Sequence, residues 1–208
     1  MKKSRKLCAF ALLALTHCTG SERASQPLCA ADAGLPAAEA LLWKRGTALS
    51  NDLQKALALP ASGMCKELGT TDCLDVHRVA LGSGDPFGSG LLEAVQRPLA
   101  TSAIAIDRLV LSACSAGVAR DAKSSPEVLK DVDLTDAPMP TEEAALTEVT
   151  RSVGSALYGA LLARDPVEAE LDVLRKLATD AEGRPVSHAD FAKLACFVIG
   201  TTTEHLLY

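Results

Sequence analysis

The residues best suited to chemistry in this 208-residue chain are Cys73 and His77, which are four positions apart in the sequence CLDVH. Residues four apart lie on one face of a helix, so the thiol and the imidazole could present two metal ligands. A closed zinc site needs about four ligands, and His188 and His205 are isolated elsewhere in the sequence. No Cys-x-x-Cys-His motif for haem attachment is present. We therefore predict no metal site and no cofactor, and interpret Cys73 as a disulfide cysteine beside a surface or capping histidine.

A hydrolytic site would require His77 to meet Asp107 and a serine in space. Asp107 falls in the apolar segment IAIDRLVLSACSAGV, residues 104–118, where a buried carboxylate needs a partner. Anchoring of a loop backbone is the favoured role for Asp107. Because neither Gly-x-Ser-x-Gly nor His-Glu-x-x-His occurs in the sequence, we predict that the protein is not an enzyme.

The segment LGSGDPFGSG, Leu81–Gly90, is rich in glycine and could suggest a phosphate-binding loop. It lacks both the GxxxxGK[ST] pattern and the GxGxxG fingerprint, so a structural turn is predicted. The aspartates of DVDLTD, within residues 121–140, also lack the glycine and the spacing of a calcium loop, and this polar stretch is predicted to be a solvated linker.

The cysteines beyond position 18 are interpreted for an oxidising compartment, where disulfides persist. Cys65 and Cys73 enclose a short polar loop, and we predict a disulfide between them. The sequence leaves open whether Cys114 and Cys196 pair or are buried as small hydrophobic side chains. Cys29 makes the number odd, so at least one of these five thiols is free or paired outside the chain.

The N-terminus predicts export. Four basic residues within the first six positions precede the uncharged run LCAFALLAL, which is too short to span a bilayer but fits the core of a secretory signal. Removal of residues 1–17 takes away four of the 21 basic residues and none of the 26 acidic ones, leaving a net charge of −9. This acidic balance argues against nucleic-acid binding and against electrostatic adhesion to anionic lipid.

The stretch Leu15-Thr16-His17-Cys18 resembles the lipobox of bacterial lipoproteins. His17 departs from the family, which has Gly, Ala or Ser at that position. The resemblance implies lipid attachment at Cys18, with a signal peptide at 1–17 and a tether at 18–36. It also implies a location in the cell envelope, at the outer membrane, on its periplasmic or surface side. The alternative is an ordinary signal peptide in which Cys18 is an incidental thiol.

Composition predicts a mostly α-helical bundle over residues 37–208, interrupted by a Gly/Pro-rich loop region. Hydrophobic residues make up 48% of the chain but aromatic ones only 3%, so the core must be built from Leu, Ala and Val. We expect Trp43 in that core. Helices are predicted over 37–59, over 104–118, from a Thr141 cap through Leu161, from an Asp165-Pro166 start to Gly183, and from a Ser187 cap onward.

Within the 104–118 helix, the stripe facing the core is predicted to contain Ile104, Leu111, Cys114 and Val118. Because this segment is apolar nearly all round, we expect it at the centre of the bundle.

Arg164, Pro166 and Glu170, followed by the terminal TTTEHLLY, resemble the last helices of large helical envelope proteins from planctomycetes and myxobacteria. Those proteins accompany or carry cytochrome-c-like domains. The phrases CLDVHRVALGSGDPFGSG and IAIDRLVLSAC resemble small uncharacterised lipoproteins of myxobacteria. The resemblance implies a location and a fold but brings no established activity.

Together these observations predict a lipid-anchored envelope protein that binds or supports a partner protein without being an enzyme. The alternative is a periplasmic protein that binds a small ligand or a metal, using Asp85 and His77 in the Cys65–Gly90 region.

Overall fold

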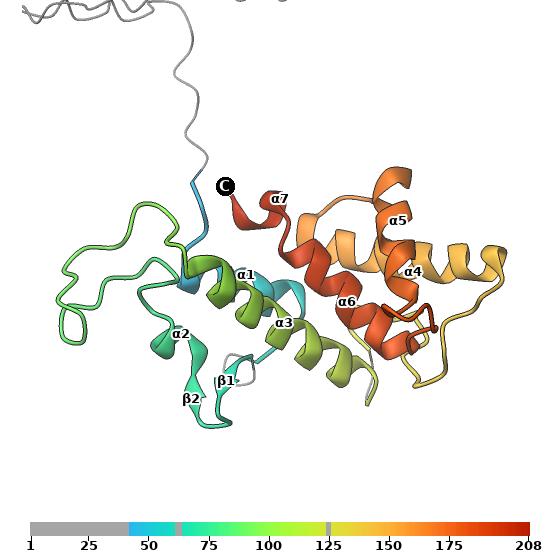
Figure 1. Ribbon diagram of the computed structural model, residues 1–208, viewed down its shortest axis with the longest axis horizontal. Coiled ribbons are helices and arrows are strands. Elements are labelled where there is room, and N and C mark those ends of the chain that lie inside the picture. The colour runs from blue at the N-terminus through green and yellow to red at the C-terminus, as the bar shows by residue number, and fades with distance from the viewer. Residues whose placement is uncertain (1–41, 61–63, 124–125) are drawn as a thin grey trace, which may run out of the picture. The chain divides into compact units, whose positions relative to one another are not determined.

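The computed structural model describes residues 42–60, 64–123 and 126–208. The predicted signal peptide, the tether, and with them Cys18 and Cys29 lie outside the described residues. Within these ranges the chain forms seven α-helices and one two-stranded hairpin (Figure 1). The prediction of a mostly α-helical protein is confirmed.

The elements follow one another in a simple order. A short helix precedes a small antiparallel hairpin and a four-residue helix, two 20-residue helices come next, and four shorter helical segments follow. Their bounds are α1 Gly46–Ala56, β1 Lys66–Glu67, β2 Thr71–Asp72, α2 Cys73–Val76, α3 Ser102–Asp121, α4 Glu143–Leu162, α5 Glu168–Arg175, a 3-10 turn Lys176–Ala178, α6 His188–Gly200 and α7 Thr203–Leu206.

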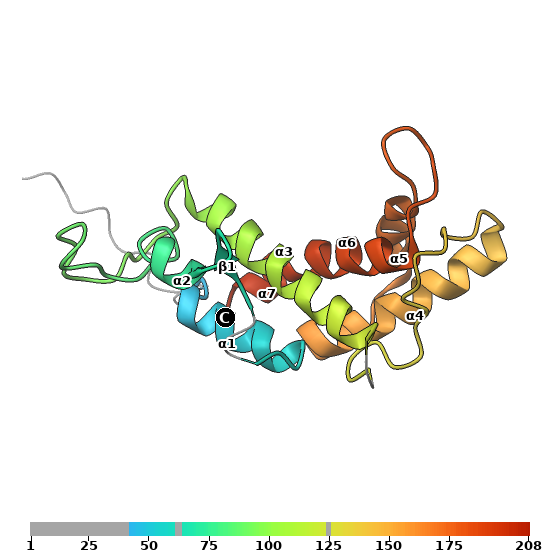
Figure 2. The same cartoon turned by 90° about the horizontal axis from the view of Figure 1, so that it is seen from below.

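The core lies where α6 packs against α3 on one side and α4 on the other, while α1 contacts both α3 and α4 (Figures 1 and 2). Its side chains are mostly Leu, Val and Ala, with Phe191 wholly buried on α6. Small residues let the helices approach closely: a Cβ added at Gly200 would lie 2.7 Å from Val110 of α3. This close approach of the helix backbones keeps the core densely packed although it contains few aromatic side chains.

The first helix is shorter than predicted. It begins at Gly46 and ends at Ala56, ahead of Pro60. Gly46 is the first residue of α1, and a Cβ there would lie 2.8 Å from Leu81. Trp43 precedes the helix, is half-buried, and packs against the edge of the core.

The α3 helix spans the predicted segment, and the predicted buried stripe is half right: Cys114 and Val118 are buried, but Ile104 and Leu111 are not. Ile104 and Leu111 are 64% and 47% exposed, and Asp107 is exposed too. The core face instead carries a stripe shifted around the helix: Ala105, Ile106, Leu109, Val110, Ala113, Cys114, Gly117 and Val118. A helix that is apolar nearly all round has no strong sequence signal for its orientation, so its neighbours decide which face is buried.

Among the described residues, α3 alone is long and apolar enough to meet the length and composition criteria for a membrane span, and half of its apolar window is buried within the protein. A core helix meets the same criteria, and the packing of α3 against α1 and α6 accounts for its apolar character.

Of the three helix starts predicted from caps, two differ from prediction and one agrees. The cap of α4 is Glu142 rather than Thr141. The α5 helix is capped at Val167, two residues after Asp165, and the Glu170 carboxylate accepts the Val167 N–H at 2.8 Å. Ser187 caps α6 as predicted, accepting the Asp190 N–H at 3.1 Å.

Candidate functional site

A disulfide joins Cys65, just before β1, to Cys73 at the first position of α2. The pair is the one predicted from the short loop, and the prediction of disulfide bonding is confirmed. Cys73 is 1% exposed. Because its sulfur is bonded to Cys65, it is not available as a metal ligand beside His77.

A second disulfide, Cys114–Cys196, joins α3 to α6 across the core. Of the alternatives left open for these two cysteines, pairing is therefore the observed one. The bond links positions 82 residues apart and ties together the two helices with the most extensive contact.

His77 takes part in a small polar cluster at the hairpin. Its Nε2 lies 2.8 Å from the Glu67 carboxylate, and the same carboxylate oxygen lies 3.2 Å from an Arg108 guanidinium nitrogen on α3. Because an ionised carboxylate only accepts hydrogen bonds, His77 donates from Nε2. The cluster therefore links α2, the hairpin and α3.

The hydrolytic arrangement that the sequence allowed is not assembled. Asp107 is exposed, and His77 is bonded to Glu67 instead. Ser112 lines an open cavity of about 240 Å³ beside Glu67 and Arg108, but His77 is not among the residues that line this cavity. A carboxylate–imidazole pair is thus present without a nucleophile in contact with it in the described part of the chain.

Asp85, the other residue considered for ligand binding, is occupied within its own loop. Its carboxylate accepts the Gly88 N–H at 3.1 Å, and its backbone pairs with Leu91. The prediction that Leu81–Gly90 is a turn agrees with this geometry. Within residues 42–60, 64–123 and 126–208, no group of three or more His, Cys, Asp or Glu side chains could hold a metal ion.

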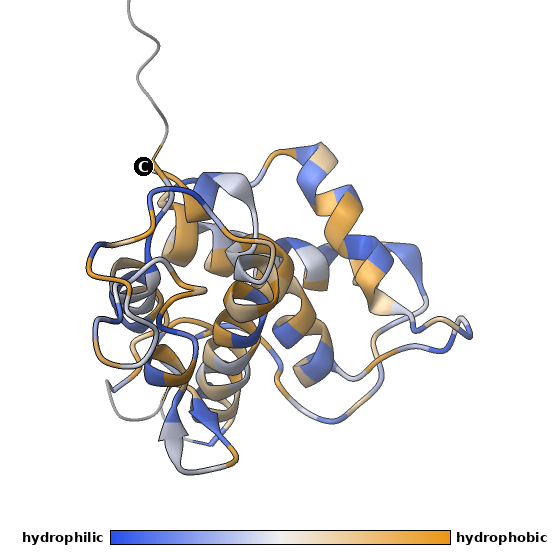
Figure 3. Ribbon diagram, turned by 60° about the vertical axis from the view of Figure 1, so that its left-hand side comes forward, coloured by the Kyte–Doolittle hydropathy of each residue, from blue (hydrophilic) through white to orange (hydrophobic). Residues whose placement is uncertain are grey.

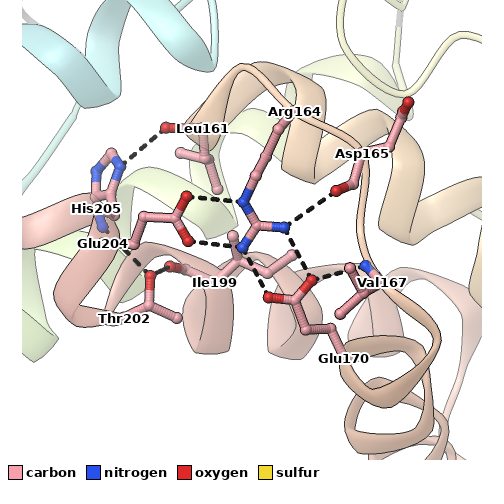
Figure 4. Close-up of polar contacts among 9 residues, drawn as sticks. All are labelled: Leu161, Arg164, Asp165, Val167, Glu170, Ile199, Thr202, Glu204 and His205. Carbon is pink, nitrogen blue, oxygen red and sulfur yellow. Dashed lines mark hydrogen bonds and ion pairs between the residues drawn. The ribbon is translucent and has the colours of Figure 1, made fainter.

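A densely connected polar cluster lies further along the chain, around Arg164 (Figure 4). The guanidinium donates to both oxygens of Glu204 at 2.7 and 2.6 Å and to both oxygens of Glu170 at 2.9 and 2.7 Å. It also donates to the Asp165 carbonyl at 3.0 Å. Arg164 follows α4, Glu170 is on α5 and Glu204 is on α7, so one side chain joins three elements.

The electrostatics of this cluster follow from the paired charges. Hydrogen bonds from Arg164 lower the pKa of Glu170 to about 2 and lower that of Glu204 below its ordinary value. The two carboxylates in turn raise the pKa of Arg164. Such bidentate pairing fixes orientation as well as charge. The cluster therefore acts as a clasp that stabilises the C-terminal end of the fold.

His205 lies beside this clasp and is 1% exposed. Its Nδ1 lies 3.2 Å from the Leu161 carbonyl at the end of α4. Because a carbonyl only accepts, Nδ1 carries the proton and Nε2 is an acceptor, which has no partner within the described residues. Burial lowers the pKa of His205, so the imidazole is held neutral.

Sequence reasoning identified Arg164 and Glu170 only through a family resemblance and did not identify their partner Glu204 as part of a site. The spacing Arg-x-Pro-x-x-x-Glu is a local signal, since the two residues flank the start of α5. No local signal connects Arg164 with Glu204, which lies 40 positions away.

Comparison with known proteins finds no matching family model, no matching curated protein and no matching solved structure.

Proposed function

We propose that this protein is a cell-envelope lipoprotein, anchored through Cys18, that supports or binds a partner protein and is not an enzyme. The observation that carries the proposal is the combination of an apolar leader ending in LTHC with two disulfides in the folded body. Disulfides are typical of compartments outside the cytosol, and a leader of this kind directs export.

The anchor chemistry would place a diacylglycerol on the Cys18 thiol. Each methylene buried in a bilayer contributes about 0.8 kcal/mol, and more than one acyl chain is needed for stable attachment. The resemblance to bacterial lipoproteins supports the outer membrane as the proposed location, with the helical body on its periplasmic or surface side.

The non-enzymatic part of the proposal is favoured by how the polar clusters are used. Glu67, His77 and Arg108 bond to one another, and Arg164 is shared by Glu170 and Glu204. Groups that would otherwise suit acid–base chemistry are thus occupied in holding elements of the fold together.

A small-ligand function is the second candidate, and one observation favours it. An open cavity of about 370 Å³ lies between α1, α2 and the following loop, and Asp75, Arg78, Ser83 and Gly84 are among its lining residues. Asp85 and His77 do not line it. A metal-binding version is disfavoured, because the Cys73 sulfur is in a disulfide.

Intact-mass analysis of the mature protein from a bacterial host with a lipoprotein pathway tests the main proposal. We expect cleavage before Cys18, added mass for a diacylglycerol with palmitate-length chains, and the mass deficit of two disulfides. Cleavage at another position, or a Cys18 without acyl mass, would contradict the anchor.

The partner role requires a separate measurement. Affinity capture from detergent-solubilised envelope, with the acylated protein as bait, should recover a stoichiometric protein partner that withstands washing. Failure to recover any stable partner would count against this part of the proposal, whereas recovery of a specific small molecule would favour the second candidate.

A further inference from the structure

The segment between α2 and α3 contains an ordered loop, here called the Phe87 loop (residues 82–95). The Val95 N–H donates to the Gly82 carbonyl at 3.1 Å and closes its base. Nearer the tip, Asp85 and Leu91 exchange both backbone hydrogen bonds, at 2.8 and 3.2 Å. These bonds hold Phe87 at the outer end of a closed turn.

The outer part of this loop exposes large apolar side chains. Phe87 is 100% exposed and Leu92 is 84% exposed, and Leu91, next to Leu92 in the sequence, is 39% exposed. Figure 3, which brings this end of the molecule forward, shows apolar stretches along the loop. Exposed apolar residues that gather on an ordered surface mark a site of interaction rather than an incidental exposure.

The loop projects from the end of the body at which the described chain begins, opposite α5 (Figures 1 and 2). Its base packs against the first described residues: a Cβ added at Gly82 would lie 2.5 Å from the Trp43 ring. Gln96, just after the loop, lines a cavity of about 160 Å³ together with Leu42 and Trp43. The apolar tip and the start of the folded body therefore belong to one end of the protein.

We propose that the Phe87 loop inserts its apolar tip into the bilayer that holds the Cys18 lipid; this inference rests on the proposed anchor. Only 23 residues separate Cys18 from Leu42. Whatever their conformation, they span at most about 80 Å. The tether thus keeps the membrane within about 80 Å of the start of the folded body. A weak intrinsic affinity is enough when the second contact is intramolecular.

The charges of the loop indicate which part of the membrane it suits. Asp85 and Glu93 are its only ionisable residues, and the Asp85 carboxylate is already bonded to the Gly88 N–H. The tip therefore presents Phe87, Leu91 and Leu92 without a basic residue. This composition suits shallow apolar insertion beneath uncharged or zwitterionic head groups rather than attraction to anionic lipid.

The test places a tryptophan at the tip of the acylated full-length mature protein. Phe87→Trp and Leu92→Trp variants are reconstituted into phosphatidylcholine vesicles, with or without bromine on the upper acyl chain. The native chain has a single tryptophan, Trp43, whose emission is subtracted by using the unsubstituted protein. The matched control is Leu68→Trp, because Leu68 is 98% exposed at the tip of the hairpin.

We expect brominated lipid to reduce the added emission of Phe87→Trp and Leu92→Trp by at least about twofold, as for residues buried at the head-group boundary, and to leave Leu68→Trp unchanged. If bromine quenches the two tip variants no more than it quenches Leu68→Trp, the insertion is overturned although the anchor stands. The exposed loop would then be assigned to contact with a protein. Equal quenching at all three positions would also overturn it. An intact mass without acyl chains on Cys18 would overturn the anchor, and this inference with it.

Discussion

Single charged side chains in this protein join segments that are separate along the chain. Asp121, at the end of α3, is 5% exposed, and its carboxylate accepts the backbone N–H groups of residues 127, 128 and 129. Burial by itself would raise the pKa of Asp121, but the Leu129 N–H, the Arg120 guanidinium and the other backbone donors hold it below its ordinary value. The carboxylate thereby fixes residues 127–129 beside the end of α3, within a stretch predicted to be a solvated linker; Leu129 is instead buried.

His205 should make stability depend on pH in the mildly acidic range. Its pKa is lowered by burial from an ordinary value of 6.5, so the folded protein keeps it neutral while the unfolded chain takes up a proton. Stability should therefore be fully present above pH 6.5 and should decline as the pH falls below it. Burial is the largest cause: the hydrogen bond to the Leu161 carbonyl raises the pKa of His205, and Lys44 and Asp52 act on it in opposite directions, but the pKa remains lowered.

The control for His205 is His205→Asn, which can keep a donor toward the Leu161 carbonyl but does not titrate. Urea unfolding between pH 7.5 and 5 should show a smaller loss of stability in this variant than in the natural protein. Equal losses would show that another group carries the pH dependence.

Arg164→Ala should lower the melting temperature, because Glu170 and Glu204 would be left as two neighbouring carboxylates without their shared cation. Arg164→Lys should restore only part of the loss, since an ammonium cannot donate to both carboxylates in a fork. Arg184→Ala is the matched control, because Arg184 is an exposed loop arginine with two acidic neighbours of its own.

The effect of Arg164→Ala should also depend on pH. The pKa of Glu170 is lowered from 4.5 to about 2 by Arg164, so this pairing stabilises the fold above pH 4.5 and loses its contribution as the pH falls toward 2. Thermal unfolding at pH 7 and near pH 2.5 should therefore show a smaller difference between natural and variant proteins at the acidic pH. A difference independent of pH would contradict the assignment.

The two glycines Gly154 and Gly159 of one helix differ in the space that neighbouring helices leave for a side chain. On α4, a Cβ at Gly154 would lie 2.8 Å from a methyl group of Leu171 on α5, whereas a Cβ at Gly159 would meet nothing within 4 Å. Alanine is favoured over glycine within helices. The two positions therefore separate helix propensity from packing between α4 and α5.

Gly159→Ala should stabilise the protein by about 0.5–1 kcal/mol, since it changes only helix propensity. Gly154→Ala should give no such gain, and Gly154→Val should destabilise by about 1–3 kcal/mol through overpacking against α5. Chemical denaturation of the three variants measures this directly. If Gly154→Ala stabilised the protein as much as Gly159→Ala, α5 would have to move and accept the added methyl group without loss of stability.

The two disulfides should contribute unequally because they close loops of different length. In the chain-entropy account, the bond across 82 positions stabilises by about 4.6 kcal/mol and the bond across 8 positions by about 2.6 kcal/mol. The double variant Cys114→Ala/Cys196→Ala should accordingly lose more stability than Cys65→Ala/Cys73→Ala in equilibrium unfolding. The reverse order would indicate that packing around α2, rather than chain entropy, dominates.

The molecule as a whole is proposed to depend on Cys18 for its location. Cys18→Ser should move the protein from the membrane fraction to the soluble fraction, because the Phe87 loop alone offers few apolar side chains. Cys29→Ser is the matched control and should stay with the membrane, since Cys29 lies outside the lipobox-like stretch. Fractionation followed by immunoblotting distinguishes these results, and a membrane-bound Cys18→Ser protein would contradict the anchor.

The amino-acid sequence was sufficient for features that depend on neighbours along the chain. A core of Leu, Ala and Val predicts helices, the Ser187 hydroxyl and the Asp190 N–H are three positions apart, and the Cys65–Cys73 loop is short enough to close locally. Tertiary structure alone decided the buried face of α3, the Cys114–Cys196 pairing and the contact of Arg164 with Glu204. The reason is physical: an apolar helix, a distant thiol and a surface charge each have several partners of similar energy, and the choice among them is made only when all the helices pack together.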